Sequence, residues 1–194
     1  MSRTNRRGLL KKGLRFGTLF REAVDEKIQE EYRKREEAEM FRPPGAINET
    51  EFLQKCTRCS DCVDACPYSV IFKHFDPESA KNQTPVITPA LDPCRMCEDM
   101  PCINACETGA LVIPEDSSSM KIGKAQIMID GCLTWMDSEC DICIEECPDT
   151  ANAIVLDKQG RARIKESACT GCGACEKSCP MGTFAIKVVP IDRE

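Results

Sequence analysis

Downstream of residue 41, the apolar residues of this chain come in brief runs rich in β-branched side chains, each bounded by Pro, Gly, Asp or Asn. Such runs predict short strands separated by turns. The predicted strands cover residues 69–75, 85–88, 110–113, 125–129, 153–156, 162–164 and 184–189. Residues 157–160, Asp-Lys-Gln-Gly, have the composition of a hairpin turn between two of them. The pattern indicates an α+β chain of small strand–turn–strand units.

The first 41 residues follow a different pattern. Apolar residues recur at every fourth position, which places them on one face of a helix; they are Phe16, Phe20, Val24, Ile28 and Tyr32. The sequence Arg-Pro-Pro-Gly at residues 42–45 ends the helical pattern. We therefore predict an amphipathic N-terminal helical extension over residues 1–41 and a second domain over residues 42–194. The apolar face of this helix could pack on the rest of this chain, on a partner subunit or on a membrane surface.

The second domain repeats four times. Each repeat begins with a block of four cysteines, and the blocks start at Cys56, Cys94, Cys132 and Cys169. The starts are 38, 38 and 37 residues apart, which is the spacing of a repeat built from one small structural unit.

The composition changes what the core of this domain is expected to contain. Sixteen of the 194 residues are Cys and only 5% are aromatic, so inorganic cofactors are expected to replace much of an apolar core. A disulfide framework is one alternative, but no secretory apolar stretch precedes the cysteines, and their C-x2-C pairs suit a metal better. Structural zinc is a second alternative, but zinc sites often recruit His, and His74 is the single histidine.

The spacing within the blocks indicates which cofactor they hold. Blocks one and four read C-x2-C-x2-C-x3-C-P, the run that binds [4Fe–4S] clusters in bacterial two-cluster ferredoxins, where the fourth Cys reaches a neighbouring cluster. Block two reads C-x2-C-x4-C-x3-C and block three reads C-x7-C-x2-C-x3-C-P. Both therefore keep three residues between the third and fourth cysteines. The sequence predicts four [4Fe–4S] clusters on sixteen thiolates: Cys56, Cys59, Cys62, Cys66, Cys94, Cys97, Cys102, Cys106, Cys132, Cys140, Cys143, Cys147, Cys169, Cys172, Cys175 and Cys179.

Four blocks can pair in two ways. In tandem pairing, block one pairs with block two and block three with block four. In nested pairing, blocks two and three form an inner pair, and blocks one and four close around it. The linkers between blocks do not discriminate, but the two divergent blocks lie in the middle, which is the symmetry of nesting. We expect two bacterial-ferredoxin-like βαββαβ units, an inner one over about residues 90–157 and an outer one over about residues 50–89 plus 158–190. Nesting predicts the ligand sets Cys56/Cys59/Cys62/Cys179, Cys169/Cys172/Cys175/Cys66, Cys94/Cys97/Cys102/Cys147 and Cys132/Cys140/Cys143/Cys106.

The net charge of the chain limits which partners it can bind. The formal net charge of −6 at pH 7 becomes about −14 when four clusters of about −2 each are added. Such acidity argues against nucleic acid binding and favours partners with basic patches. No stretch approaches the roughly 20 apolar residues of a transmembrane span. The sequence contains no phosphate loop, dinucleotide fingerprint or catalytic triad, so no catalytic site is predicted.

Several segments carry a family likeness: Arg-Pro-Pro-Gly-Ala at 42–46, Cys-Thr-Arg-Cys at 56–59, Ala-Cys-Pro-Tyr at 65–68, the nine residues 94–102, Cys-Asp-Ile-Cys at 140–143 and Cys-Thr-Gly-Cys-Gly at 169–173. Together they resemble the NapG/MauM ferredoxin-type proteins over about residues 42–190, including the unusual gaps of blocks two and three. The family is similar to the four-cluster subunits of molybdopterin oxidoreductases. The resemblance implies nested pairing and a role in passing electrons between a quinol-linked membrane partner and a redox enzyme.

Residues 5–11, Asn-Arg-Arg-Gly-Leu-Leu-Lys, are similar to a twin-arginine export motif. Charged residues interrupt the uncharged stretch that should follow, so we expect the cytoplasmic face of the membrane, with the periplasm as the alternative. The sequence therefore predicts an electron-transfer protein, preferably a subunit of a larger redox complex that includes a membrane-bound, quinone-linked protein. The alternative is a metal-stabilised assembly subunit without redox traffic.

Overall fold

The computed structural model describes Lys27 and residues 40–114, 120–148, 152–191 and 193. The chain divides into two units, Met1–Glu39 and Met40–Glu194, and the elements described below belong to the second. Except for Lys27, the predicted N-terminal helix and the export-like motif lie outside the described residues. Both stay predictions. Within the described part of the chain, no helix is long and apolar enough to cross a membrane.

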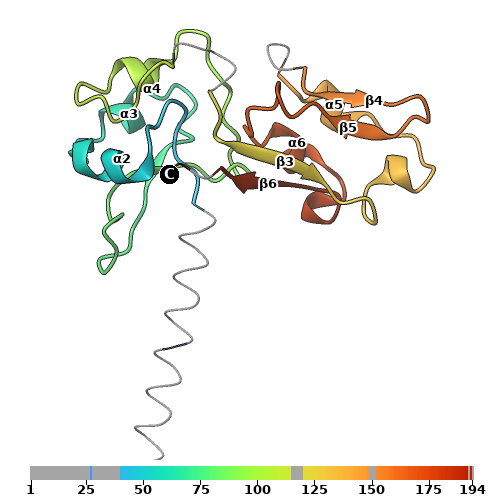
Figure 1. The fold of residues 1–194 in the computed structure, drawn as a ribbon, viewed down its shortest axis with the longest axis horizontal. Coiled ribbons are helices and arrows are strands. Elements are labelled where there is room, and N and C mark those ends of the chain that lie inside the picture. The colour runs from blue at the N-terminus through green and yellow to red at the C-terminus, as the bar shows by residue number, and fades with distance from the viewer. Residues whose placement is uncertain (1–26, 28–39, 115–119, 149–151, 192, 194) are drawn as a thin grey trace, which may run out of the picture. The chain divides into compact units, whose positions relative to one another are not determined.

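The C-terminal lobe, residues 120–190, has the βαββαβ order of a bacterial ferredoxin. Strand β3 pairs with β6 in an antiparallel register that runs from Gly123 opposite Pro190 to Ile127 opposite Ile186. Strands β4 and β5 form an antiparallel hairpin (Figure 1). In chain order the elements are β3 (Gly123–Ile127), the 3-10 turn η2 (Leu133–Trp135), α5 (Ile142–Glu145), β4 (Ile154–Leu156), β5 (Ala162–Ile164), α6 (Ala174–Ser178), η3 (Gly182–Phe184) and β6 (Ile186–Pro190).

The N-terminal lobe, residues 40–114, repeats this order with shorter strands. Strands β1 and β2 form the antiparallel hairpin of this lobe. Two isolated antiparallel β-bridges, Phe41–Ile87 and Ala46–Leu111, make the other strand-like pairings. The elements are α2 (Glu49–Lys55), α3 (Asp61–Asp64), β1 (Phe72–Lys73), β2 (Pro85–Val86) and α4 (Pro101–Asn104). Both lobes therefore fit a ferredoxin-like repeat.

Six of the seven predicted strand runs overlap a strand, while the run at 110–113 makes only the bridge at Leu111. The predicted hairpin turn at 157–160 is confirmed. The Asp157 carboxylate accepts the amide protons of Gln159 and Arg161 at 2.9 Å each, and the Gly160 amide donates to the Asp157 carbonyl. The short polar side chain of Asp157 thus closes the turn, as Asp does in many tight turns.

The predicted nested pairing, with its inner and outer units, is wrong. Helix α3 of block one packs on α4 of block two, and α5 of block three packs on α6 of block four. The hairpins β1–β2 and β4–β5 return the chain within each pair, so consecutive blocks meet across short loops. Closing a short loop costs less chain entropy than closing residue 56 onto residue 179, and neighbours in sequence usually pack together.

The two lobes meet where blocks two and four approach each other. The Cys94 amide donates to the Cys172 carbonyl at 3.0 Å, and the Ile122 amide donates to the Thr170 carbonyl at 2.7 Å. Gly171 has φ +69°, and a Cβ there would lie 2.2 Å from the backbone carbon of Gly123. Glycine adopts this conformation without strain, and any Cβ would clash with Gly123, so Gly171 determines how closely the lobes join.

A buried arginine ties the start of the domain to the N-terminal lobe. Arg42 is 3% exposed, donates through Nε and Nη2 to the Glu49 carboxylate at 3.0 and 2.5 Å, and donates through Nη1 to Thr84 Oγ1 at 2.7 Å. Its guanidinium also lies 4.5 Å from the ring centroid of the fully buried Phe52. Burial acts to raise the pKa of Glu49, but the Arg42 hydrogen bond and nearby positive charges lower it overall. The planar guanidinium fork makes all these contacts at once.

We predict that Arg42→Lys destabilises the domain, because an ammonium cannot replace the bidentate contact or the stacking on Phe52. The expected loss is about 2–4 kcal/mol, or roughly 5–15 °C in the melting temperature. The measurement is thermal loss of visible cluster absorbance under anaerobic conditions. Arg163→Lys is the control, because Arg163 is 52% exposed in its 3.0 Å ion pair with Asp157 and should cost about 1 kcal/mol or less. Equal shifts for the two variants would contradict the prediction.

Candidate functional site

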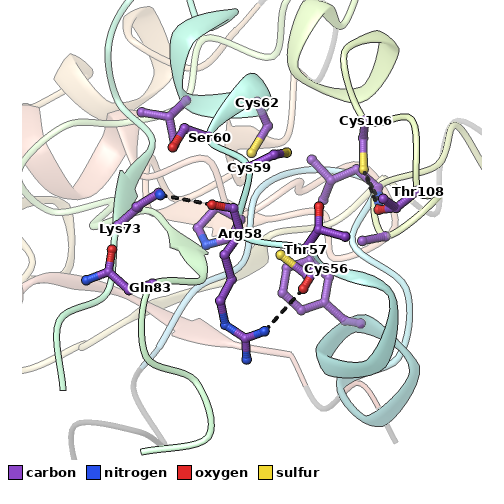
Figure 2. Close-up of a pocket in the computed structure, with 15 residues that line it drawn as sticks. Cys56, Thr57, Arg58, Cys59, Ser60, Cys62, Lys73, Gln83, Cys106 and Thr108 are labelled. Carbon is purple, nitrogen blue, oxygen red and sulfur yellow. Dashed lines mark hydrogen bonds between the residues drawn. The ribbon is translucent and has the colours of Figure 1, made fainter. Parts of the chain in front are cut away.

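A pocket in the N-terminal lobe brings four thiols together. It holds about 400 Å³ of empty space including its open mouth. Figure 2 shows the sulfur atoms of the first three cysteines of block one and of the last cysteine of block two around this space. We call this group set I: Cys56, Cys59, Cys62 and Cys106.

The C-terminal lobe has a matching pocket of about 390 Å³. Three of its thiols come from block three and the fourth comes from block four, so the fourth cysteine again crosses to the partner block. This group is set III: Cys132, Cys140, Cys143 and Cys179.

The remaining eight cysteines form two inner groups. Cys66 lies close enough to Cys97 and Cys102 to influence the pKa of both thiols, and Cys147 does the same for Cys172 and Cys175. Set II is therefore Cys66, Cys94, Cys97 and Cys102, and set IV is Cys147, Cys169, Cys172 and Cys175. All five buried cysteines belong to these inner sets.

The sixteen cysteines all lie in described residues, and none forms a disulfide. In the described part of the chain, no three His, Cys, Asp or Glu side chains converge tightly enough to hold a single metal ion. Thiols grouped in fours around a space of about 400 Å³ suit a larger cofactor, with one thiolate on each of the four irons of a cubane.

The buried thiols lose their protons only when a cation compensates the thiolate charge. The pKa of Cys94 is raised to about 12, chiefly by burial and in the same direction by the neighbouring thiols Cys102 and Cys172, while the Met96 amide opposes them. Burial together with Cys132, Cys140 and Cys179 likewise raises the pKa of Cys143 to about 11. Without a cofactor these groups are neutral at pH 7. Thiolate coordination therefore releases protons, and cluster binding is favoured as the pH rises.

The loops between the cysteines turn backbone amides toward sulfur. The second residue after the first Cys has a positive φ in blocks one, two and four: 62° at Arg58, 49° at Met96 and 69° at Gly171. Amide groups donate to sulfur at 3.4 Å from Leu111 to Cys106 and at 3.3 Å from Ala153 to Cys147. Hydrogen bonds to cluster sulfur are one means of setting a reduction potential.

Arg58 holds its strained loop in place. Its guanidinium donates to the carbonyls of Asn82, Ala80 and Cys56, while Lys73 Nζ donates to the Arg58 carbonyl at 2.9 Å (Figure 2). These bonds attach the set I loop to the β1–β2 connection. The positive φ explains why the backbone needs this support, since a residue with a Cβ is strained there.

Comparison with known proteins agrees with the tandem geometry. The 4Fe-4S dicluster domain family matches residues 55–110, which contain blocks one and two, and residues 138–183, which contain block four and most of block three. The methylamine utilization ferredoxin-type protein MauM of Paracoccus denitrificans is 39% identical over 167 residues, covering 80% of this chain and 74% of its own. The ferredoxin-type protein NapG of Escherichia coli is 38% identical over 164 residues, covering 78% and 71%.

This chain belongs to the NapG/MauM family of ferredoxin-type proteins. The expected resemblance is thereby confirmed, and so is the expected cofactor content: the chain carries four [4Fe–4S] clusters and serves in electron transfer. The ferredoxin-type protein NapF of Escherichia coli is more distant, at 28% identity over 147 residues.

The nested ligand sets are the part of the site prediction that the geometry of this NapG/MauM protein contradicts. Cys106 lies with block one and Cys179 with block three, whereas nesting exchanged them. The divergent middle blocks reflect local packing instead. The long gap of block three forms η2, where Thr134 Oγ1 accepts the Ala162 amide at 3.0 Å and Trp135 Nε1 donates to the Ala162 carbonyl. No pattern in the sequence pointed to these contacts.

We predict that Thr134→Val lowers the reduction potential of the set III cluster. The Thr134 hydroxyl accepts from Ala162 and lies 3.3 Å from Cys132 Sγ, so its proton is placed to donate to that sulfur. Losing one such bond, worth about 0.5–1.5 kcal/mol, shifts a one-electron potential by roughly 20–60 mV. EPR-monitored redox titration is the measurement.

Thr108→Val is the matched control, because its hydroxyl lies further from Cys106 Sγ, at 3.7 Å, on an exposed residue. Its shift should be smaller. A Thr134→Val potential equal to that of the unmodified protein would remove Thr134 from this role.

Proposed function

We propose that this chain relays single electrons through clusters bound by sets I to IV, as a subunit of a redox complex between a quinol-linked membrane protein and a redox enzyme. Each bound [4Fe–4S] cluster supplies a one-electron couple. The chain's residues supply the thiolates, the amide donors and the spacing. The family membership supports the electron-transfer role, and the resemblance to four-cluster oxidoreductase subunits supports the choice of partners.

One observation carries the proposal: the four thiol sets adjoin one another in a row. Sets I and II are neighbours through Cys62 and Cys102, since burial first and then nearby thiols, Cys102 among them, raise the pKa of Cys62 to about 12. Sets II and IV meet at Cys94 and Cys172, whose backbones share the 3.0 Å hydrogen bond. Sets IV and III meet at Cys175 and Cys143, because Cys143 contributes to the raised pKa of the buried Cys175. The order is therefore I, II, IV, III.

The burial of the sets supports the same order. The two inner sets contain every buried cysteine, while Cys59 of set I is exposed and the other cysteines of sets I and III are half-buried. Electron exchange with partners is thus favoured at the two ends of the row. A metal-stabilised assembly subunit without redox traffic has no need for an unbroken row of sets.

The loaded protein is predicted to contain about 16 iron atoms per chain, four in each cluster, and all four clusters should be reducible. Iron and acid-labile sulfide analysis of anaerobically purified protein, with EPR after dithionite reduction, measures both. Reducible clusters are the result expected for the relay, whereas clusters that cannot be reduced would contradict it and support the assembly role.

Cys179→Ser tests the ligand sets. Because Cys179 lines the pocket of set III, the variant should lose or alter the cluster of block three, and iron should fall toward about 12 per chain. EPR identifies the affected cluster. Cys106→Ser is the counterpart, expected to affect the cluster on Cys56, Cys59 and Cys62. Damage to that cluster by Cys179→Ser would restore nested pairing.

Gly171→Ala tests the junction between sets II and IV. Its Cβ would lie 2.2–2.4 Å from Gly123 backbone atoms, so the lobes must separate, and the magnetic coupling between reduced clusters at this junction should weaken at unchanged iron content. Gly109→Ala is a matched control, because Gly109 has φ +70° but nothing within 4 Å of its Cβ position. Unchanged coupling in Gly171→Ala would show that the junction lies elsewhere.

A further inference from the structure

The mouth of the set III pocket is an apolar surface that no described side chain covers. Ile142 and Met181 line the pocket and are each 37% exposed, and Phe184, at the end of η3, is 80% exposed. The position of a Cβ on Gly131 would lie 1.9 Å from the Phe184 carbonyl oxygen, so Phe184 sits against the loop that leads into Cys132. Exposed large apolar side chains gathered at one site mark interaction surfaces.

The chain segment that supplies three of the set III cysteines is rich in acidic residues. The segment 128–148 contains six acidic residues and no Lys or Arg, and Glu139 and Asp141 flank the set III cysteine Cys140. All six are exposed, and within the described part of the chain none forms a salt bridge. They are Asp130, Asp137, Glu139, Asp141, Glu145 and Glu146.

The pocket of set I, at the other end of the row, is lined by basic side chains, whereas no charged side chain lines the set III pocket. Arg58 and Lys73 line it, and no acidic residue does (Figure 2). Residues 55–73 carry three basic side chains against the two acids Asp61 and Asp64. The two ends of the relay therefore present different charges to their surroundings.

We propose that the face around set III, formed by Ile142, Met181, Phe184 and the six acids, docks a redox partner protein whose contact surface is apolar at the centre and ringed by Lys and Arg. The inference rests on the proposed electron relay. The apolar centre excludes water where the two redox centres approach, and the opposite charges steer encounter and orientation. The set I end does not fit such a partner, because its own pocket is lined by basic groups.

Charge also decides against other occupants of this face. A second copy of the chain in a two-fold contact would oppose six acids with six acids, since an isologous contact meets its own patch. An anionic membrane surface is repelled by the same carboxylates. A basic protein is the partner that relieves the negative charge.

The experiment uses cluster-loaded full-length chain, reduced with dithionite, and cytochrome c as a basic redox probe. Rates of cytochrome c reduction are measured against ionic strength, and carbodiimide cross-links from carboxylates to probe lysines are mapped by mass spectrometry. At low salt, the double variant Glu139→Gln/Asp141→Asn should slow the reaction about three- to tenfold, and high salt should remove the difference. Cross-links should fall on residues 137–146.

Asp61→Asn/Asp64→Asn is the matched double control, since Asp61 flanks Cys62 as Asp141 flanks Cys140, and it should change the rate less than about twofold. Phe184→Ala should slow the reaction at both high and low salt. Equal effects of the two double variants, or cross-links that fall mainly outside residues 137–146, would overturn the docking proposal. So would a dimer, detected by light scattering, whose formation changes with these charge substitutions. Iron content and EPR separate the outcomes: intact reducible clusters with no docking at set III leave the relay standing, whereas clusters that cannot be reduced remove both.

Discussion

Mutual repulsion among buried thiolates is the constraint on which this structure depends. Sixteen sulfur atoms are gathered into four groups, and both apolar cores of the domain include cysteines among their buried residues. Burial and neighbouring thiols raise the pKa of several of them, Cys62 and Cys94 included, so these thiols can be ionised together only when cations lie between them. Iron supplies those cations, and cofactor binding and folding are for that reason a single process. The buried aliphatic residues alone would give a small core for a domain of this length.

Consecutive blocks pair because closing the shorter loops within each lobe costs less chain entropy. The lobes join through close approach of their backbones. Gly171 lies against Gly123, and Gly173 lies against Pro89, where a Cβ would come within 2.4 Å. Arg193 adds a second tie, donating to the carbonyl of Ala46 in one lobe and of Lys121 in the other. Rigid joining matters for an electron carrier, because electron tunnelling weakens steeply as the distance between redox centres grows. The same glycines that permit the fold therefore maintain the proposed route.

The row of thiol sets gives the domain two chemically distinct ends. Its middle is buried, its first end is bordered by Arg58 and Lys73, and its last end is bordered by acids around exposed apolar side chains. A relay between two different proteins benefits from this difference, because unlike surfaces select unlike partners.

The sequence by itself determined the local chemistry: the number of clusters, the strand runs, the hairpin at 157–160 and the family. These are short-range properties, since C-x2-C spacing fixes a loop around a cubane wherever that loop lies. It did not determine which blocks pair, and the symmetry of the divergent middle blocks suggested nesting. Tertiary structure decided for tandem pairing, because α3 packs on α4 and α5 packs on α6, and the cysteine spacing does not show which helices meet. The charge difference between the two ends likewise emerged only when folding placed set I and set III at opposite ends of the row.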